Sequence, residues 1–136
     1  EQALAPLLTG VDVIVAGGSD TRLADGTDVL RSGDVAEGNY PFLTSGTDGA
    51  PVLVVSTDGN FSYVGRLVIQ FDAEGEIITS ALNTAVNGAY STDTAGVERL
   101  YGVGTDFLAA STKATAVKQV TDAVDAVITL KDGTLF

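Results

Sequence analysis

The sequence predicts a mixed α/β domain with an antiparallel β-meander and a C-terminal helix. Three observations lead to this fold class. A short apolar run at residues 11–16 stops on Gly17 and Gly18. Three further short apolar runs, at residues 52–56, 63–71 and 77–82, are separated by tight turns. Residues 112–129 then carry apolar side chains at helical spacing. Strand-length runs combined with one long amphipathic segment are typical of a mixed fold.

The first strand is the most informative element. Residues 3–8 are expected to be the last turns of a helix, and Gly10 suits the left-handed conformation that ends one. The strand at 11–16 is followed by Ser19, Asp20 and Thr21. A buried strand that ends in a glycine turn delivers such polar side chains to the carboxyl edge of a sheet, where α/β enzymes keep their chemistry.

The middle of the chain divides into an irregular part and a regular part. Residues 22–50 are rich in Asp, Gly, Thr and Ser, and within them residues 40–43 are predicted to form an edge strand, where Pro41 is tolerated. Turns at 58–60 and 72–76 would join the strands at 52–56, 63–71 and 77–82 into a meander. Phe61 and Tyr63 are expected to pack within it, and residues 83–94 are expected to be irregular.

The last part of the chain is predicted to be helical. Residues 95–100 form a short helical turn in this interpretation. The longer helix is expected at 112–129, capped by Ser111 or Thr112. Its apolar stripe, which is expected to pack in a core or between domains, consists of Val117, Val120, Val124, Val127 and Ile128. Residues 131–136 look like a turn that leads into a further element, so we expect the chain to be a piece of a longer one.

Composition excludes several classes of function. The chain has 7 basic and 18 acidic residues, with a net charge of −11, which argues against nucleic acid and anionic membranes as partners. It contains no Cys and no His, which excludes disulfides, thiolate sites, a Ser-His-Asp triad and histidine-ligated zinc. No apolar run approaches the roughly 20 residues that span a bilayer.

Two segments together resemble the 5′-nucleotidase family of calcineurin-like metallophosphoesterases. The first is the strand and loop at residues 11–21. The second is residues 52–72, which contain Tyr63-Val64-Gly65-Arg66-Leu67 and lead into the Asp72-Ala73-Glu74-Gly75 turn. The resemblance implies that residues 1–110 are the C-terminal portion of a catalytic domain with an αββα sandwich fold. It also implies that residues 111–136 are a helix and linker toward a missing C-terminal domain.

The resemblance further implies a secreted, metal-dependent phosphomonoesterase of the 5′-nucleotidase or alkaline-phosphatase-like kind. Such a protein would be periplasmic or extracellular and would act on a phosphomonoester or nucleotide. The family holds a pair of divalent cations, drawn here from Mn, Zn, Mg or Ca, which clamp the phosphate and activate a water. Most of the family's metal ligands would lie upstream of this chain, so it is expected to be inactive in isolation.

The chain departs from the family at the metal-binding loop. There the family has Gly-His-Ser-His-Thr, and setting Thr21 against the final Thr puts Gly18 at the first His and Asp20 at the second. Gly18 cannot bind a metal, whereas the carboxylate of Asp20 could bind Mg²⁺, Mn²⁺ or Ca²⁺. The alternative is that Asp20 closes the loop as an Asx turn or cap. Ser19 has no base in reach, so no catalytic residue and no other cofactor-binding residue is assigned.

Two other functions stay open at this point. One is a non-catalytic scaffold or binding module derived from the same fold, which the loss of the histidines favours. The other is a self-contained acidic cation-binding domain, which would rest on loops such as Asp25-Gly26-Thr27-Asp28. Strand edges and a helix face left without partners are expected to cause self-association, or packing against missing parts of the parent chain.

Overall fold

The computed structural model describes residues 1–102, 104, 106 and 111–132. The chain divides into two compact units, Glu1–Gly96 and Val97–Phe136, and each is described by itself. The turn and element expected at residues 133–136 lie outside the described residues. The predicted boundary at residue 110 stays a prediction.

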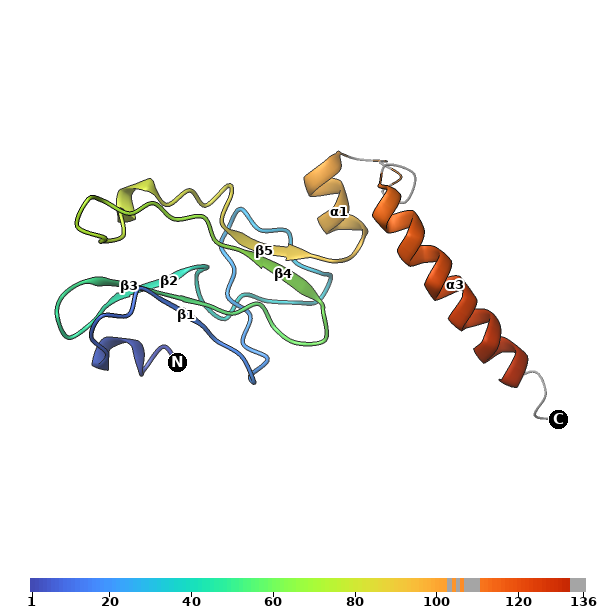
Figure 1. Cartoon of the computed structure of the whole chain (residues 1–136), viewed down its shortest axis with the longest axis horizontal. Helices are drawn as coiled ribbons and strands as arrows, with labels where there is room; N and C mark the ends of the chain where they lie inside the picture. The colour runs from blue at the N-terminus through green and yellow to red at the C-terminus, as the bar shows by residue number, and fades with distance from the viewer. Residues whose placement is uncertain (103, 105, 107–110, 133–136) are drawn as a thin grey trace. The chain divides into compact units, whose positions relative to one another are not determined.

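A three-stranded sheet forms the centre of the first unit (Figure 1). Its strands are β1 (Val13–Val15), β2 (Phe42–Ser45) and β3 (Pro51–Val55), in the order β1-β3-β2. β1 is parallel to β3, with Ile14 opposite Val54, and β2 is antiparallel to it. The central strand reads as a continuous apolar run, Val52 to Val55 being buried, because both of its faces are covered. The edge strand predicted near residues 40–43 is confirmed as β2.

A second, two-stranded sheet pairs β4 (Tyr63–Arg66) with β5 (Gly88–Ser91) in antiparallel register. The predicted meander is therefore wrong in its pairing: β3 pairs with β1 and β2, and β4 pairs with β5. Residues 67–82 form an irregular arch with one bridge, Phe71 to Ile77, and a short 3₁₀ helix, η2 (Thr79–Ala81).

The reason for this difference lies in Asn87, which is 1% exposed. Its side-chain amide accepts a hydrogen bond from Val68 N at 2.6 Å and donates one to Val68 O at 3.1 Å. These are the bonds that a neighbouring strand would otherwise make. The β4–β5 ladder therefore stops at Arg66, and the alternating residues after it do not extend the strand.

The core is built in small clusters around β3. On one face Ala5, from the 3₁₀ helix η1 (Ala5–Leu7), packs with Val52 and Val54. Leu23, Tyr40 and Val55 form a second cluster. The third cluster contains Ala24, Tyr63 and Ala89, so the predicted packing role of Tyr63 is confirmed.

Two α-helices complete the described residues, α1 (Thr94–Tyr101) and α3 (Thr112–Asp132). Both were expected, and Ser111 caps α3 by accepting a hydrogen bond from Ala114 N at 3.3 Å. The expected mixed α/β class is therefore confirmed. In the part of the chain that the structure describes, neither helix is long and apolar enough to cross a membrane.

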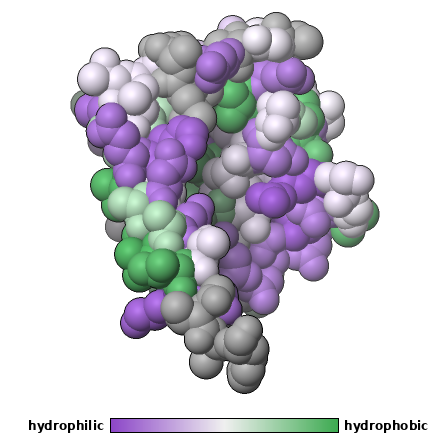
Figure 2. Space-filling model, turned by 90° about the vertical axis from the view of Figure 1, so that its right-hand side faces the viewer, coloured by the Kyte–Doolittle hydropathy of each residue, from purple (hydrophilic) through white to green (hydrophobic). Residues whose placement is uncertain are grey.

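The apolar stripe of α3 is at the surface, with each of its five predicted members more than half exposed. Figure 2 shows one face of the molecule, on which apolar side chains lie among polar ones. The packing partner predicted for this stripe stays a prediction.

Candidate functional site at the carboxyl edge of β1 and β3

Two loops meet where the parallel strands β1 and β3 end. Ala16 N donates to Val55 O at 2.8 Å, which continues the strand pairing to the last residue before Gly17. Beyond the strands, Thr21 O accepts hydrogen bonds from Ser56 Oγ at 2.8 Å and from Asp58 N at 3.2 Å. The loop at 16–22 is therefore fastened to the loop at 56–60, as expected for polar residues at the carboxyl edge of a sheet.

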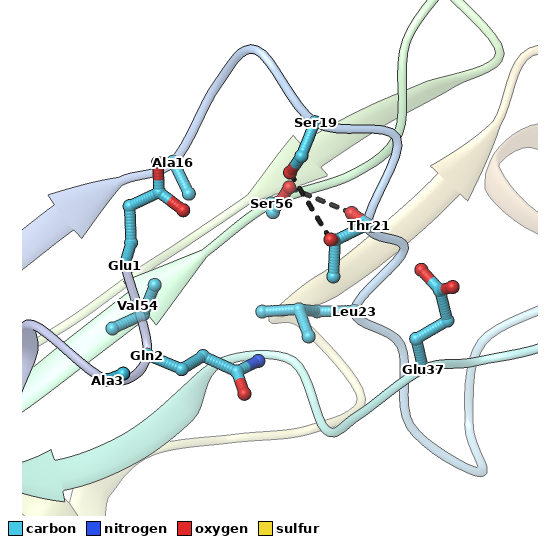
Figure 3. A pocket seen from close by; sticks show the side chains of 10 residues that line it. All are labelled: Glu1, Gln2, Ala3, Ala16, Ser19, Thr21, Leu23, Glu37, Val54 and Ser56. Carbon is cyan, nitrogen blue, oxygen red and sulfur yellow. Dashed lines mark hydrogen bonds between the residues drawn. The ribbon is translucent and has the colours of Figure 1, made fainter.

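A cavity of about 240 Å³ opens beside these loops (Figure 3). Three hydroxyl groups line it, those of Ser19, Thr21 and Ser56, together with the carboxylate of Glu37. Ser19 Oγ donates to Thr21 Oγ1 at 3.2 Å. These groups can exchange hydrogen bonds with a polar ligand, but Ser19 contacts another hydroxyl here and no base that would activate it as a nucleophile.

Asp20 lies exposed on the first loop, against the second. A Cβ placed on Gly59 would stand only 2.9 Å from Asp20 Oδ1, so the two loops approach closely at this point. Among the described residues no hydrogen bond closes an Asx turn at Asp20. Nor does this part of the chain bring three His, Cys, Asp or Glu side chains together as a metal site would require.

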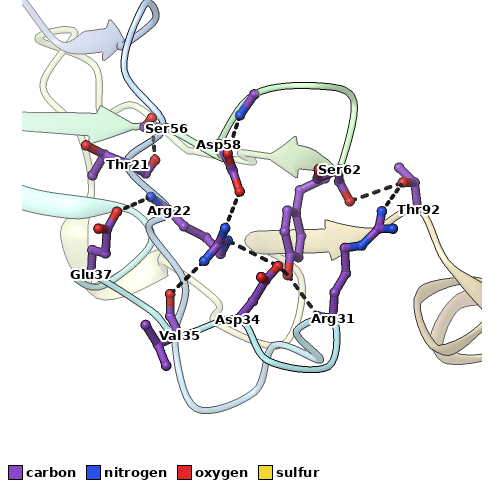
Figure 4. Close-up of polar contacts among 12 residues, drawn as sticks. Thr21, Arg22, Arg31, Asp34, Val35, Glu37, Ser56, Asp58, Ser62 and Thr92 are labelled. Carbon is purple, nitrogen blue, oxygen red and sulfur yellow. Dashed lines mark hydrogen bonds and ion pairs between the residues drawn. The ribbon is translucent and has the colours of Figure 1, made fainter.

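The next residue, Arg22, is the centre of a polar network (Figure 4). Its guanidinium group forms an ion pair with Asp58 and lies 3.5 Å from Asp34, and Nη1 donates to Val35 O at 3.1 Å. Its backbone N–H donates to Glu37 Oε2 at 2.8 Å. The ring of Tyr63 lies 5.4 Å from the guanidinium carbon, within the range of a cation–π contact. One arginine thus ties the loop at 16–22 to the segments at 34–37 and 58–63.

The network shifts two pKa values. The backbone N–H of Gly59 and the Arg22 guanidinium both donate to Asp58, and they lower the pKa of this carboxyl. Burial, and then the hydrogen bond from Tyr63 Oη to Asp34 at 2.6 Å, raise the pKa of the Tyr63 phenol. Asp58 therefore stays ionised and Tyr63 stays protonated near neutral pH, which preserves the network there.

The second loop has an unusual backbone. Asp58, Asn60 and Phe61 have φ angles of 74°, 57° and 56°, in the left-handed region that favours glycine. Phe61 is 93% exposed, so the expectation that it packs within the meander is wrong. Its backbone is turned away from the strand direction before β4 begins, and this leaves the ring in solvent.

Known proteins share part of this chain's sequence, although no family model matches it. The chain is 40% identical over 83 residues to the snake venom 5′-nucleotidase of Gloydius brevicauda. This aligned segment covers 61% of this chain and 14% of that protein. The chain is 39% identical over 80 residues to the 5′-nucleotidase of Homo sapiens, or 59% of this chain and 14% of that one.

The chain is a homologue of 5′-nucleotidases. A solved structure agrees: the 5′-nucleotidase precursor from Thermus thermophilus is similar with a TM-score of 0.53 and 32% identity. That match covers 73% of this chain and 19% of the other. By comparison, the chain spans about a seventh of the length of the curated 5′-nucleotidases it matches.

Sequence reasoning found the loop at 17–21 but missed the network beside it. Arg22 and Asp34 lie outside the two segments that resemble the family, and Asp58, which lies inside the second, is brought to them only by folding. The available signal was the position of Arg22, a cation directly after the polar loop in a chain of 18 acidic and 7 basic residues.

Proposed function

We propose that this chain is part of a metal-dependent phosphomonoesterase that acts on nucleotides, in which the carboxyl edge of β1 and β3 forms one wall of the active site. The identity of 38–40% to 5′-nucleotidases over 80–83 residues carries the proposal. Metal dependence is general in that family. The polar loop, the hydroxyl-lined cavity and the exposed Asp20 at the strand ends are the features that such a wall would present.

The residues of this chain do not fit a complete metal site. A pair of divalent cations needs several carboxylate or imidazole ligands, and the described residues bring no three such groups together. Asp20 is at most one ligand of a site completed by other segments. We therefore propose that the chain by itself is inactive, and we derive no catalytic step from its residues.

A variant of Asp20 in the natural gene product tests its role. Asp20→Asn removes one charged ligand, so half-maximal phosphomonoesterase activity should require a higher Mn²⁺ concentration. Asp12→Asn is the matched control, because Asp12 is exposed just before the amino end of β1. An unchanged Mn²⁺ requirement in Asp20→Asn would show that Asp20 is not a ligand.

Gly18 allows the converse experiment. A Cβ at this position would meet nothing within 4 Å, although φ is +77°, where His is strained but tolerated better than most residues. If Gly18 stands where the family has a metal-binding histidine, Gly18→His should lower the Mn²⁺ requirement. The same substitution should leave it unchanged if the loop is remote from the metals.

A second candidate is a non-catalytic scaffold or binding module derived from the same fold. Gly18 favours the scaffold or binding module, because it has no side chain to bind a metal and occupies the position of the family's first histidine. A natural gene product that hydrolyses no phosphomonoester with Mn²⁺, Zn²⁺ or Mg²⁺ would support this candidate and exclude the first.

We also propose that the protein is exported from the cell. Its relatives include snake venom enzymes, and this supports the proposal. Fractionation of cells that express the natural gene would test it, with recovery of the product only from the cytoplasm as the contrary result.

A further inference from the structure

A tight turn between β3 and β4 carries an exposed asparagine at its tip. Ser62 N donates to Gly59 O at 3.2 Å, which places Asn60 and Phe61 at the two central positions of the turn. Their φ angles of 57° and 56° are both positive, as a type I′ turn requires. The side chain of Asn60 is exposed, and asparagine tolerates this left-handed conformation better than most residues.

The sequence of this turn has a feature that its geometry does not require. Asn60-Phe61-Ser62 matches the pattern Asn-x-Ser/Thr, with x other than proline, which is the acceptor pattern for N-glycosylation. The other asparagines of the chain lack Ser or Thr at the second following position: Asn39, Asn83 and Asn87. The turn accounts for asparagine at position 60, but it makes no demand on the side chain at position 62.

Both polar side chains of this motif are free of the fold. Among the residues that the structure describes, neither the amide of Asn60 nor the hydroxyl of Ser62 forms a hydrogen bond. Ser62 is held through its backbone, since its carbonyl accepts a hydrogen bond from Thr92 N at 3.0 Å (Figure 4). The buried amide of Asn87, by contrast, uses both of its ends to bind Val68. A sugar on Asn60 would therefore extend into solvent and displace no side-chain contact of the described residues.

We infer that Asn60 is an N-glycosylation site that carries an oligosaccharide in the exported protein. Its Nδ2 atom forms a bond to the anomeric carbon of the sugar, and the bond from that carbon to the diphosphate of a polyprenyl diphosphate carrier breaks. The carrier diphosphate is the leaving group, and the amide gives up one proton. This reaction takes place outside the cytoplasm, so the inference rests on the proposed export and extends it to a modification of this chain.

Peptide mapping of the natural gene product tests the inference. The product is recovered separately from the cytoplasm and from outside it, in cells that express the natural gene. Trypsin cleaves after Arg31 and Arg66, so Asn60 lies in the peptide 32–66. In the exported fraction we expect this peptide to carry a mass increment on Asn60 that yields sugar fragment ions on collision.

Four variants assign the modification to the motif. Asn60→Gln removes the acceptor nitrogen, and Ser62→Ala removes only the hydroxyl that the pattern requires, so each should abolish the modified form. Ser62→Thr keeps a hydroxyl and should retain it. Asn39→Gln is the matched control, because Asn39 is an exposed asparagine in the same peptide with Pro41 at the second following position.

Each contrary outcome overturns the inference for a defined reason. An unmodified peptide 32–66 in the exported product would overturn it and leave the proposed export standing. A product found only in the cytoplasm would contradict the proposed export, and the inference would fall with it. A modified form that persists in Asn60→Gln would place the sugar on another residue. One that persists in Ser62→Ala would show that the motif does not direct the attachment.

Discussion

The strained loop at Phe61 gives the sharpest stability prediction. Replacing Phe61 by Gly should stabilise the first unit, although deleting an aromatic side chain ordinarily destabilises a protein. Glycine adopts a φ of 56° without strain, which recovers about 1–2 kcal/mol. It loses about 0.2 kcal/mol of burial, because the side chain is 93% exposed. The greater freedom of glycine in the unfolded chain costs a further 0.4–1 kcal/mol or so.

The net expectation is a gain of about 0.5 kcal/mol, or roughly 2–4 °C in melting temperature for a unit of this size. Urea denaturation followed by circular dichroism measures it. Phe61→Ala is the matched control, because alanine removes the ring but keeps the strain, so its stability should be nearly unchanged. If Phe61→Gly is no more stable than Phe61→Ala, the backbone at this position is not strained and the reasoning is refuted.

Three further predictions concern the rest of the chain. Gly96→Ala should destabilise the protein in urea denaturation, because the added Cβ would stand 1.6 Å from Ser91 O. Alanine normally stabilises a helix by about 1 kcal/mol relative to glycine. A more stable variant would therefore contradict the close approach of Gly96 to Ser91. Burial raises the pKa of Tyr40 to about 12, so the unfolded chain ionises first above pH 10 and stability is lost as the pH rises through this range. Tyr40→Phe should therefore lose about 1.4 kcal/mol less stability between pH 9 and 11 than the unaltered protein, and an equal loss would refute this. The isolated chain should self-associate, and light scattering measures this. The reason is that the outer edge of β1 and the apolar stripe of α3 lack partners among the described residues. A stable monomer would show that these two surfaces do not require a partner.

The sequence predicted those elements whose pattern is local. The apolar run at β3, the edge strand β2 directly after Pro41 and the helical spacing of α3 each depend on residues close together in the chain. The position of Ser19, Asp20 and Thr21 at the carboxyl edge of β1 followed from the glycines that end the strand. In each case a short-range signal agrees with the tertiary structure.

Pairing between distant segments could not be predicted. The alternation after Arg66 favoured a longer strand, but the side chain of Asn87 takes the hydrogen bonds that would have extended it. β5 was missed because Gly88, Ala89 and Ser91 are small residues with little preference for strands. The ion pair between Arg22 and Asp58 joins residues 36 positions apart, so nothing local indicates it.

The central claim is that these residues form one wall of a nucleotidase active site and do not make a complete site themselves. The most direct test measures hydrolysis of adenosine 5′-monophosphate by the natural gene product and by this 136-residue chain, each with added Mn²⁺ and Zn²⁺. The account predicts hydrolysis by the gene product, and none by the isolated chain. Hydrolysis by the isolated chain would contradict the incomplete metal site. Inactivity of both with every metal would contradict the nucleotidase function and leave the binding or scaffold module.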